Sequence, residues 1–276
     1  MNSLRCVHVL MRGSPAFPIA ISALLFSQSA LCDEKSTADV AAADKHRLDL
    51  TIFQIDVAET DFFTDVILFG YTHAFNSSTR AGLMAGVTNT RQPRDSNAGG
   101  VSSQNQTGLS DTVVTFQHDF SEKMTVSPWV PKTLGLGASV IIPTGDADDG
   151  LSIDAWLLAL NAGWGFELFS DFWLVPGFGY QTTFSEGDFA VPSSLLYASL
   201  PIVWVSDSGF WVGYSYTIMR EFEEADWLDD HGVTVGKMFR NGFSISLDYG
   251  TLERVGSLVV PDDALLVLNF YYQFGR

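Results

Sequence analysis

The sequence has little of what marks the common soluble, nucleic-acid-binding and helical membrane classes. Its only two cysteines, Cys6 and Cys32, lie in the first 32 of 276 residues, so a chain that starts after them cannot build a disulfide framework. Basic residues are scarce, 15 against 32 acidic ones, which argues against a protein that grips nucleic acid phosphates. After residue 32 no apolar run reaches 18 residues, which excludes a helical membrane protein.

The remaining composition is apolar. Hydrophobic residues make up 46% of the chain and charged residues 17%, which is too apolar and too weakly charged for a disordered protein. An all-β globular protein and an outer-membrane β-barrel remain as candidates.

The amino terminus has the order of a secretory signal peptide. Arg5 and Arg12 precede an apolar stretch at residues 17–26, and small residues follow up to Cys32. We therefore predict a signal peptide over residues 1–32, Sec-type export, and cleavage after Cys32 or after Ala30. A lipidated Cys32 is the alternative, although the large Leu31 before it fits a lipoprotein site poorly.

Residues 33–45 are polar and alanine-rich without a strand pattern, and we interpret them as a flexible periplasmic tail. From residue 46 to residue 276 the pattern has the period of two that is typical of strands. Twelve strands are predicted, each close to the length that crosses a bilayer when tilted: 48–57, 65–75, 80–88, 109–120, 132–143, 153–168, 171–183, 194–205, 210–220, 231–240, 242–252 and 264–274. The fold class is accordingly all-β, a single antiparallel transmembrane outer-membrane β-barrel of about twelve strands.

The connections between these strands alternate in length, as they do in outer-membrane barrels with both termini in the periplasm. The second, sixth, eighth and tenth connections are short, and the tenth carries Asn241-Gly242, a pair favoured in tight hairpins. The odd-numbered connections are longer, including 89–108, 184–193, 221–230 and 253–263. The fourth connection, residues 121–131, is an exception because it should be short and is not.

A soluble β-sandwich would show the same alternation, so the less apolar face of the strands decides between the two folds. In a sandwich that face meets water and carries long charged residues. Here it carries mostly glycine, serine, threonine, asparagine and alanine, which suit the inside of a narrow barrel. The pattern therefore favours the barrel.

Three segments resemble a known family. Leu109-Ser110-Asp111 is followed by a strand ending in His118-Asp119-Phe120, and then by a second strand, from Gly135, that runs into Pro143-Thr144-Gly145-Asp146. This order resembles the outer-membrane transporter family named for the MetA-pathway of phenol degradation, over about residues 105–276. Ser110 and Ile142 depart from that family's glycine and leucine. The resemblance implies a barrel that passes hydrophobic or aromatic compounds.

The predicted lumen face is the expected site of selectivity. Assigning the larger apolar groups to lipid leaves small and polar groups inside, with some apolar ones interleaved, which suits small, weakly polar organic solutes. The candidates are Asp111, Thr115, Gln117, Asp119, Ser139, Asn161, Gln181, Tyr197, Trp211, Asp248 and Asn269. Among basic residues only Arg240 is assigned to the lumen, which argues against a channel for acidic sugars.

Acidic residues gather in the outer loops, five of which are net negative, so the mouth should attract cations. The densest group lies in residues 221–230, and it fits either a solvated loop or a collector of divalent ions that bridge lipopolysaccharide phosphates. Asp146, Asp148 and Asp149 are weak candidates for a calcium site, because a full set of spaced ligands is missing. We expect no metal and no cofactor.

Catalytic signals are weak. A barrel hydrolase would pair a nucleophilic serine with a histidine, and His73, His118 and His231 have no convincing serine partner in the sequence, His73 being the nearest candidate. The sequence therefore predicts a monomeric, non-enzymatic outer-membrane channel of a Gram-negative bacterium, in contact with lipid and lipopolysaccharide, for passive uptake of small hydrophobic or aromatic compounds. A structural or surface-interaction barrel with a closed lumen is the alternative.

Overall fold

The structure is a computed structural model that describes residues 6–9, 29–32, 45–56, 63–95, 101–120, 133–145, 155–169, 171–184, 194–222, 227–239, 241–255 and 258–275. Within these ranges no helix is long and apolar enough to cross a membrane. Of the predicted tail at 33–45 only Lys45 lies within them, and the exceptional fourth connection lies outside them. In the predicted signal peptide a short antiparallel pair is formed by β1 (Cys6–Val9) and β2 (Ser29–Cys32).

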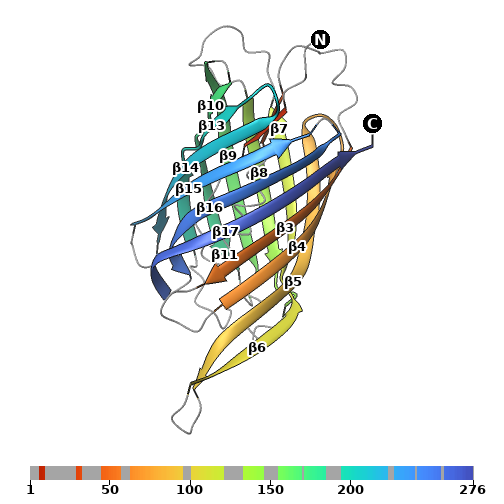
Figure 1. The fold of residues 1–276 in the computed structure, drawn as a ribbon. Helices are drawn as coiled ribbons and strands as arrows, with labels where there is room; N and C mark the ends of the chain where they lie inside the picture. Colours follow the sequence, from red (N-terminus) through yellow and green to blue (C-terminus); the bar gives the residue numbers. More distant parts are fainter. Residues whose placement is uncertain are drawn as a thin grey trace.

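One antiparallel sheet closes on itself to form the barrel (Figure 1). Its strands are β3 (His46–Asp56), β4 (Phe63–Ala74), β5 (Thr79–Asp95), β6 (Val101–Leu109), β7 (Thr112–Phe120), β8 (Thr133–Ile142), β9 (Leu157–Phe169), β10 (Phe172–Leu174), β11 (Gly177–Thr183), β12 (Ser194–Ser199), β13 (Ile202–Val205), β14 (Phe210–Glu221), β15 (Trp227–Met238), β16 (Phe243–Val255) and β17 (Leu258–Phe274). The first barrel strand, β3, pairs with the last, β17, so the ring has no open edge at this point. A two-sheet sandwich is thereby excluded.

The ring has twelve strands, because three of them are interrupted and each counts as one: β6 with β7, β10 with β11, and β12 with β13. The predicted fold class and all twelve predicted strands are confirmed. Two interruptions fall at prolines on neighbouring strands, Pro176 and Pro201, which have no amide hydrogen to donate to the ladder. The ladder continues between them through a bond from the Val175 amide to the Pro201 carbonyl oxygen, 2.9 Å.

The third interruption is a β-bulge opposite Gly86. Residues 85–86 of β5 face residues 110–112 of the neighbouring strand, between the register pairs 84/113 and 87/109. The extra residue reverses which side chains face inward, so that Leu109 is exposed while Ser110 and Asp111 are both buried. The Ser110 amide still donates to the Gly86 carbonyl oxygen, at 3.0 Å.

The two ends of the barrel differ. At the terminal end, where β3 begins and β17 ends, three of the predicted short connections turn tightly with a positive φ, at Asp171, Gly209 and Gly242. At the hairpin end, β5 and β6 extend past the neighbouring strands as a two-stranded ribbon (Figure 1).

Two predicted outer loops are therefore wrong. Most of 89–108 is strand, since β5 reaches Asp95 and β6 starts at Val101, and most of 253–263 is strand between β16 and β17. In both segments the apolar alternation of the sequence stops while the pairing of the strands persists. The sequence pattern then gives no sign of the strand.

Burial alternates along the strands in the predicted phase. On β14, Trp211, Ser215 and Met219 are buried, whereas Phe210 and Tyr214 are exposed. In a single closed layer the buried set faces the lumen and the exposed set faces outward. The outer surface is apolar accordingly, with Leu136, Leu160, Val235, Leu247 and Leu266 among its exposed large side chains.

Candidate functional site: the lumen wall

The structure places all eleven predicted selectivity residues on the lumen face of their strands. Asp111, Ser139, Gln181, Tyr197, Trp211, Asp248 and Asn269 are buried, and Thr115, Gln117, Asp119 and Asn161 are half-buried in the same phase. Their role in selectivity stays a prediction. Seven of them take part in four groups of contacts: a polar chain, an apolar arc, a set of ion pairs and a clamp at the hairpin end.

The polar chain crosses four adjacent strands, β3, β17, β16 and β15. Thr51 Oγ1 donates to Asn269 Oδ1 at 2.9 Å, and Asn269 Nδ2 donates to Asp248 Oδ2 at 2.6 Å. Thr234 Oγ1 donates to the other oxygen of the same carboxylate. Asp248 is 0% exposed, so a carboxylate at this position needs these donors. Two predicted site residues, Asp248 and Asn269, are thus brought together.

The apolar arc lies on the strands from β10 to β14. One buried cluster joins Val175, Val203, Val205 and Trp211 with the flanking Trp173, toward the terminal end. A second cluster joins Leu195, Tyr197 and Met219 toward the hairpin end. The lumen wall therefore has a hydrogen-bonded side and an apolar, aromatic side.

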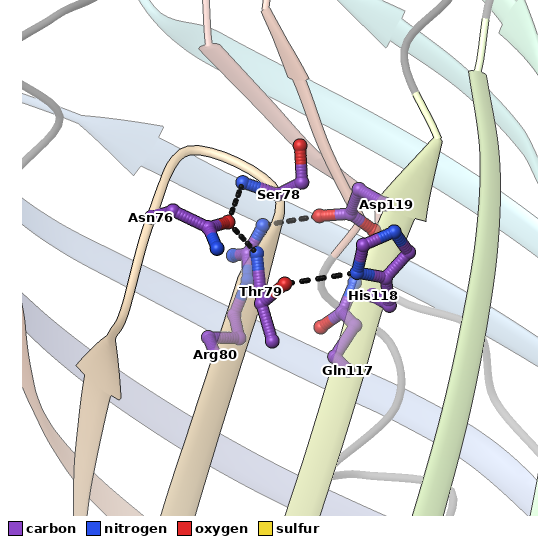
Figure 2. A network of polar contacts seen from close by, with 7 residues as sticks. All are labelled: Asn76, Ser78, Thr79, Arg80, Gln117, His118 and Asp119. Carbon is purple, nitrogen blue, oxygen red and sulfur yellow. Dashed lines mark hydrogen bonds and ion pairs between the residues drawn. The ribbon is translucent and has the colours of Figure 1, made fainter.

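Two arginines point into the lumen near the terminal end, and both are paired with carboxylates. Arg80 donates to Asp119, whose other oxygen accepts from Gln117 Nε2 at 2.8 Å (Figure 2). Arg47 Nε lies 2.8 Å from an Asp49 oxygen, and its guanidinium lies over the Tyr271 ring, 5.5 Å from the centroid.

The prediction that Arg240 alone is a basic lumen residue is wrong, and Arg240 itself lies outside the described residues. Arg47 was overlooked although it stands two residues before Asp49, and i and i+2 share a face of a strand. Arg80 was overlooked at the first residue of its predicted strand, where period-two phase is hard to assign.

The turn before β5 is held by Asn76, whose Oδ1 accepts from the amides of Ser78 and Thr79 at 2.9 and 2.8 Å (Figure 2). Thr79 Oγ1 in turn lies 2.9 Å from His118 Nδ1. This packing fixes the end of the strand that carries Arg80.

The histidines considered as catalytic candidates take part in contacts among aromatic rings. His73 packs against His46 and Phe75, with ring centroids 5.2 and 5.0 Å apart. His231 Nδ1 lies 2.6 Å from the Tyr214 hydroxyl, and His118 contacts the Phe120 ring. These are the surroundings of structural, ring-packed histidines.

The clamp at the hairpin end brings together two of the segments that carry the family resemblance. Asp111 Oδ1 accepts from the backbone amides of Thr144 and Gly145 at 3.1 and 3.2 Å. Thr144 Oγ1 donates to the Ser110 carbonyl oxygen at 3.0 Å. The carboxylate thus ties the bulge to the end of β8, which favours a structural role over a role in selectivity.

We expect Asp111→Ala to destabilise the barrel by about 2 kcal/mol, because two amides lose a charged acceptor. Asp111→Asn keeps one carbonyl acceptor and should lose about half as much. The check is the urea midpoint of unfolding followed by tryptophan fluorescence. An alanine variant as stable as the wild type would show that the clamp is not structural.

The metal candidates Asp146, Asp148 and Asp149 lie outside the described residues. Within the described part of the chain, no group of three or more His, Cys, Asp and Glu side chains could hold a metal ion. The acidic segment 221–230 is not one loop, because Asp229 and Asp230 belong to β15 and Asp230 is buried.

The barrel is similar in fold to solved outer-membrane channels. An outer membrane channel from Pseudomonas putida F1 matches with a TM-score of 0.64 and 14% identity, over 86% of this chain and 98% of that chain. The NanC porin matches with a TM-score of 0.55 and 7% identity, over 82% of this chain and 100% of that chain. No protein-family model and no curated protein matches the chain. At these identities the likeness establishes the fold: a closed twelve-stranded barrel of the outer-membrane channel type.

Proposed function

We propose that this protein is an outer-membrane channel for the passive uptake of small hydrophobic or aromatic compounds. The observation that carries the proposal is the two-sided lumen wall. Its apolar arc contains Trp173, Tyr197 and Trp211, and the polar chain through Asp248 lies on strands β15, β16, β17 and β3. Such a wall can contact an apolar ring while supplying a few hydrogen bonds.

Charge supports the same class of solute. Arg47 and Arg80 are each paired with an aspartate, so these lumen cations are not a ladder for acidic sugars. Asp248 adds a buried carboxylate, and the chain as a whole is acidic. We expect a channel that prefers cations among ions.

The outer surface supports a place in the membrane. Aromatic rings lie at both ends of the exposed apolar face, with His46, Tyr71 and Phe274 at the terminal end and Tyr180 and Phe222 at the hairpin end. Barrels of the outer membrane carry such girdles at the two interfaces. With both chain termini in the periplasm, as in other outer-membrane barrels, the terminal end of the barrel faces the periplasm.

The deciding experiment is single-channel conductance of the refolded mature protein in planar bilayers, at two salt concentrations, with and without small aromatic compounds. We expect steady openings that aromatic solutes modulate. A well-folded barrel that never conducts would overturn the proposal in favour of the closed-lumen alternative. Mass spectrometry of the exported protein would test cleavage after Ala30 or Cys32.

We expect Leu247→Arg to cost about 2–4 kcal/mol in a bilayer, because an arginine near the middle of the lipid face of β16 is buried in hydrocarbon. Phe239→Arg, at the terminal girdle, should cost no more than about 1 kcal/mol. Refolding equilibria in phospholipid vesicles measure both. If the two variants were destabilised equally, Leu247 would not lie deeper in the membrane than Phe239.

A further inference from the structure

Two histidine rings face each other across the first strand pair of the barrel. His46 is the first residue of β3, His73 lies near the end of β4, and the two are direct register partners. Their ring centroids lie 5.2 Å apart, with an angle of 42° between the ring planes. Both side chains are half-buried and share the outward phase of the exposed Leu48 and Tyr71. The pair is therefore partly accessible on the outer face, at the terminal end.

Most of the ring nitrogens of this pair make no hydrogen bond. His46 Nδ1 lies 2.7 Å from the Tyr71 hydroxyl. Among the described residues, neither His46 Nε2 nor either ring nitrogen of His73 has a hydrogen-bond partner. An ideal Cβ at Gly275 would lie 2.6 Å from His46 Cδ2 and 3.4 Å from Nε2, so the glycine leaves this edge of the ring without a side chain over it.

The chemistry of the pair is that of a metal ligand set. Imidazole nitrogens bind copper, zinc and nickel ions. A histidine that binds a metal through one nitrogen almost always donates the N–H of the other nitrogen to an oxygen or to water, which fixes the orientation of the ring. The Tyr71 oxygen is in place to accept this bond from His46 Nδ1. His46 is thus oriented with Nε2 available to an ion.

The backbone beside the pair is held on both sides. The Lys45 amide donates to the Gly275 carbonyl oxygen at 3.1 Å, and the Lys45 carbonyl oxygen accepts from the Ala74 amide at 2.8 Å. β3 therefore lies between β17 and β4 up to its first residue (Figure 1). The His46 ring also stacks on Phe274, with the centroids 5.2 Å apart. Because the two imidazoles are already close together, binding an ion orders little of the chain.

We propose that His46 and His73 together bind one divalent transition-metal ion, and that the ion ties the start of the first barrel strand to β4. His46 supplies Nε2, His73 supplies one ring nitrogen, and water fills the other coordination positions. Cu²⁺ is the divalent first-row ion that such a nitrogen site binds most tightly. The site does not depend on the proposed function, because it lies on the outer face of the barrel.

The probe is Cu²⁺ alone, titrated into the refolded mature protein in a buffer that does not bind copper and followed by calorimetry. We expect one tight site per chain. The electron paramagnetic resonance spectrum of the bound ion should show coupling to two imidazole nitrogens, since both rings are ligands. Coupling to a single imidazole would overturn the pair as the ligand set.

His73→Phe is the main variant. It removes both nitrogens and keeps an aromatic ring against His46 and Phe75, whose centroids lie 5.2 and 5.0 Å from that of His73, so it should fold like the wild type. We expect Cu²⁺ affinity to fall at least about tenfold, because the ion loses a second ligand that is held at high effective concentration. An unchanged affinity would show that the ion binds elsewhere.

His231→Phe is the matched control. His231 also faces outward with Nδ1 2.6 Å from a tyrosine hydroxyl, that of Tyr214, but its ring contacts are with Tyr214 and Tyr216 instead of a histidine. Asp229 lies 3.5 Å from its Nε2, so the control also tests a single imidazole beside a carboxylate. The tight site should change less than about twofold. Equal losses in the two variants would overturn the proposal.

The urea midpoint of unfolding tests whether the ion ties the two strands together. An ion held by residues on two strands binds the folded barrel in preference to the unfolded chain. At about one hundred times its dissociation constant, Cu²⁺ should favour the folded state about a hundredfold in the wild type and in His231→Phe, and should raise the midpoint of both. His73→Phe should show no such rise. Tight binding to the wild type without a rise would overturn the tie, because the unfolded chain would then bind the ion equally well.

Discussion

Replacing Gly86 with alanine is expected to destabilise the barrel by about 3 kcal/mol. An ideal Cβ at this position would lie 2.0 Å from the Ile67 carbonyl oxygen and 2.8 Å from Leu68 Cδ2. The leucine methyl can rotate away, but the carbonyl oxygen belongs to the ladder between β4 and β5 and can move only with its strand. The close approach arises where β5 faces the bulge, with two residues opposite three.

Gly213→Ala is the matched control, because a Cβ there would lie 3.4 Å from Val203 Cγ2, an ordinary contact. We expect a change within about 0.5 kcal/mol. The measurement is the urea midpoint of both variants in the same phospholipid vesicles. If the two alanines cost the same, the approach at Gly86 is not a constraint on the fold.

Asp119→Asn is expected to shift the ratio of potassium to chloride permeability about fivefold toward chloride. The substitution leaves the Arg80 guanidinium without its charged partner on the lumen wall. A unit charge about 8 Å from a passing ion is worth about 0.5 kcal/mol in water, with opposite sign for potassium and chloride, so the ratio changes by about 1 kcal/mol, which corresponds to about fivefold. Reversal potentials across a salt gradient give the ratio directly.

A variant of the partner residue, Arg80, tests the direction of the change in ion preference. Arg80→Gln keeps a hydrogen-bond donor near Asp119 but removes the cation, so it should raise the preference for potassium by a similar factor. High salt should reduce both shifts, because both side chains are partly exposed and screening acts on them. Shifts of the same sign in the two variants would show that the pair does not set the lumen charge.

The strands were predictable because each buries one face, and the alternation of Trp156, Leu158 and Leu160 with small residues is visible without any knowledge of partners. The ribbon of β5 and β6 was not predictable in this way. The sequence of 89–108 lacks the apolar alternation of the other strands, and only the register between β5 and β6 defines the ribbon.

The composition of the lumen wall was predictable by phase, but its contacts were not. Phase puts Asp248 and Asn269 inside, yet their bond depends on the register between β16 and β17. Asp111 meets Thr144 and Gly145 because a bulge turns it toward the end of β8, and a bulge leaves no mark in a pattern of single residues. The lack of space for a Cβ at Gly86 arises from the same bulge, because Gly86 lies opposite it on β5.

Pro176 and Pro201 interrupt neighbouring strands, and the Val175 amide bonds directly to the Pro201 carbonyl oxygen. Each proline removes one amide proton from the ladder. Pro176 faces β9, where its carbonyl oxygen accepts from the Trp164 amide, and Pro201 faces Val175, so the seams on both sides of the strand formed by β10 and β11 each lack one interstrand bond here. Amides beside these two seams open to solvent at a smaller free-energy cost than those of the uninterrupted strands, and they exchange with heavy water first. The strand pairing is thus not equally stable around the barrel. It opens most easily on the side that carries Trp173 and Trp211.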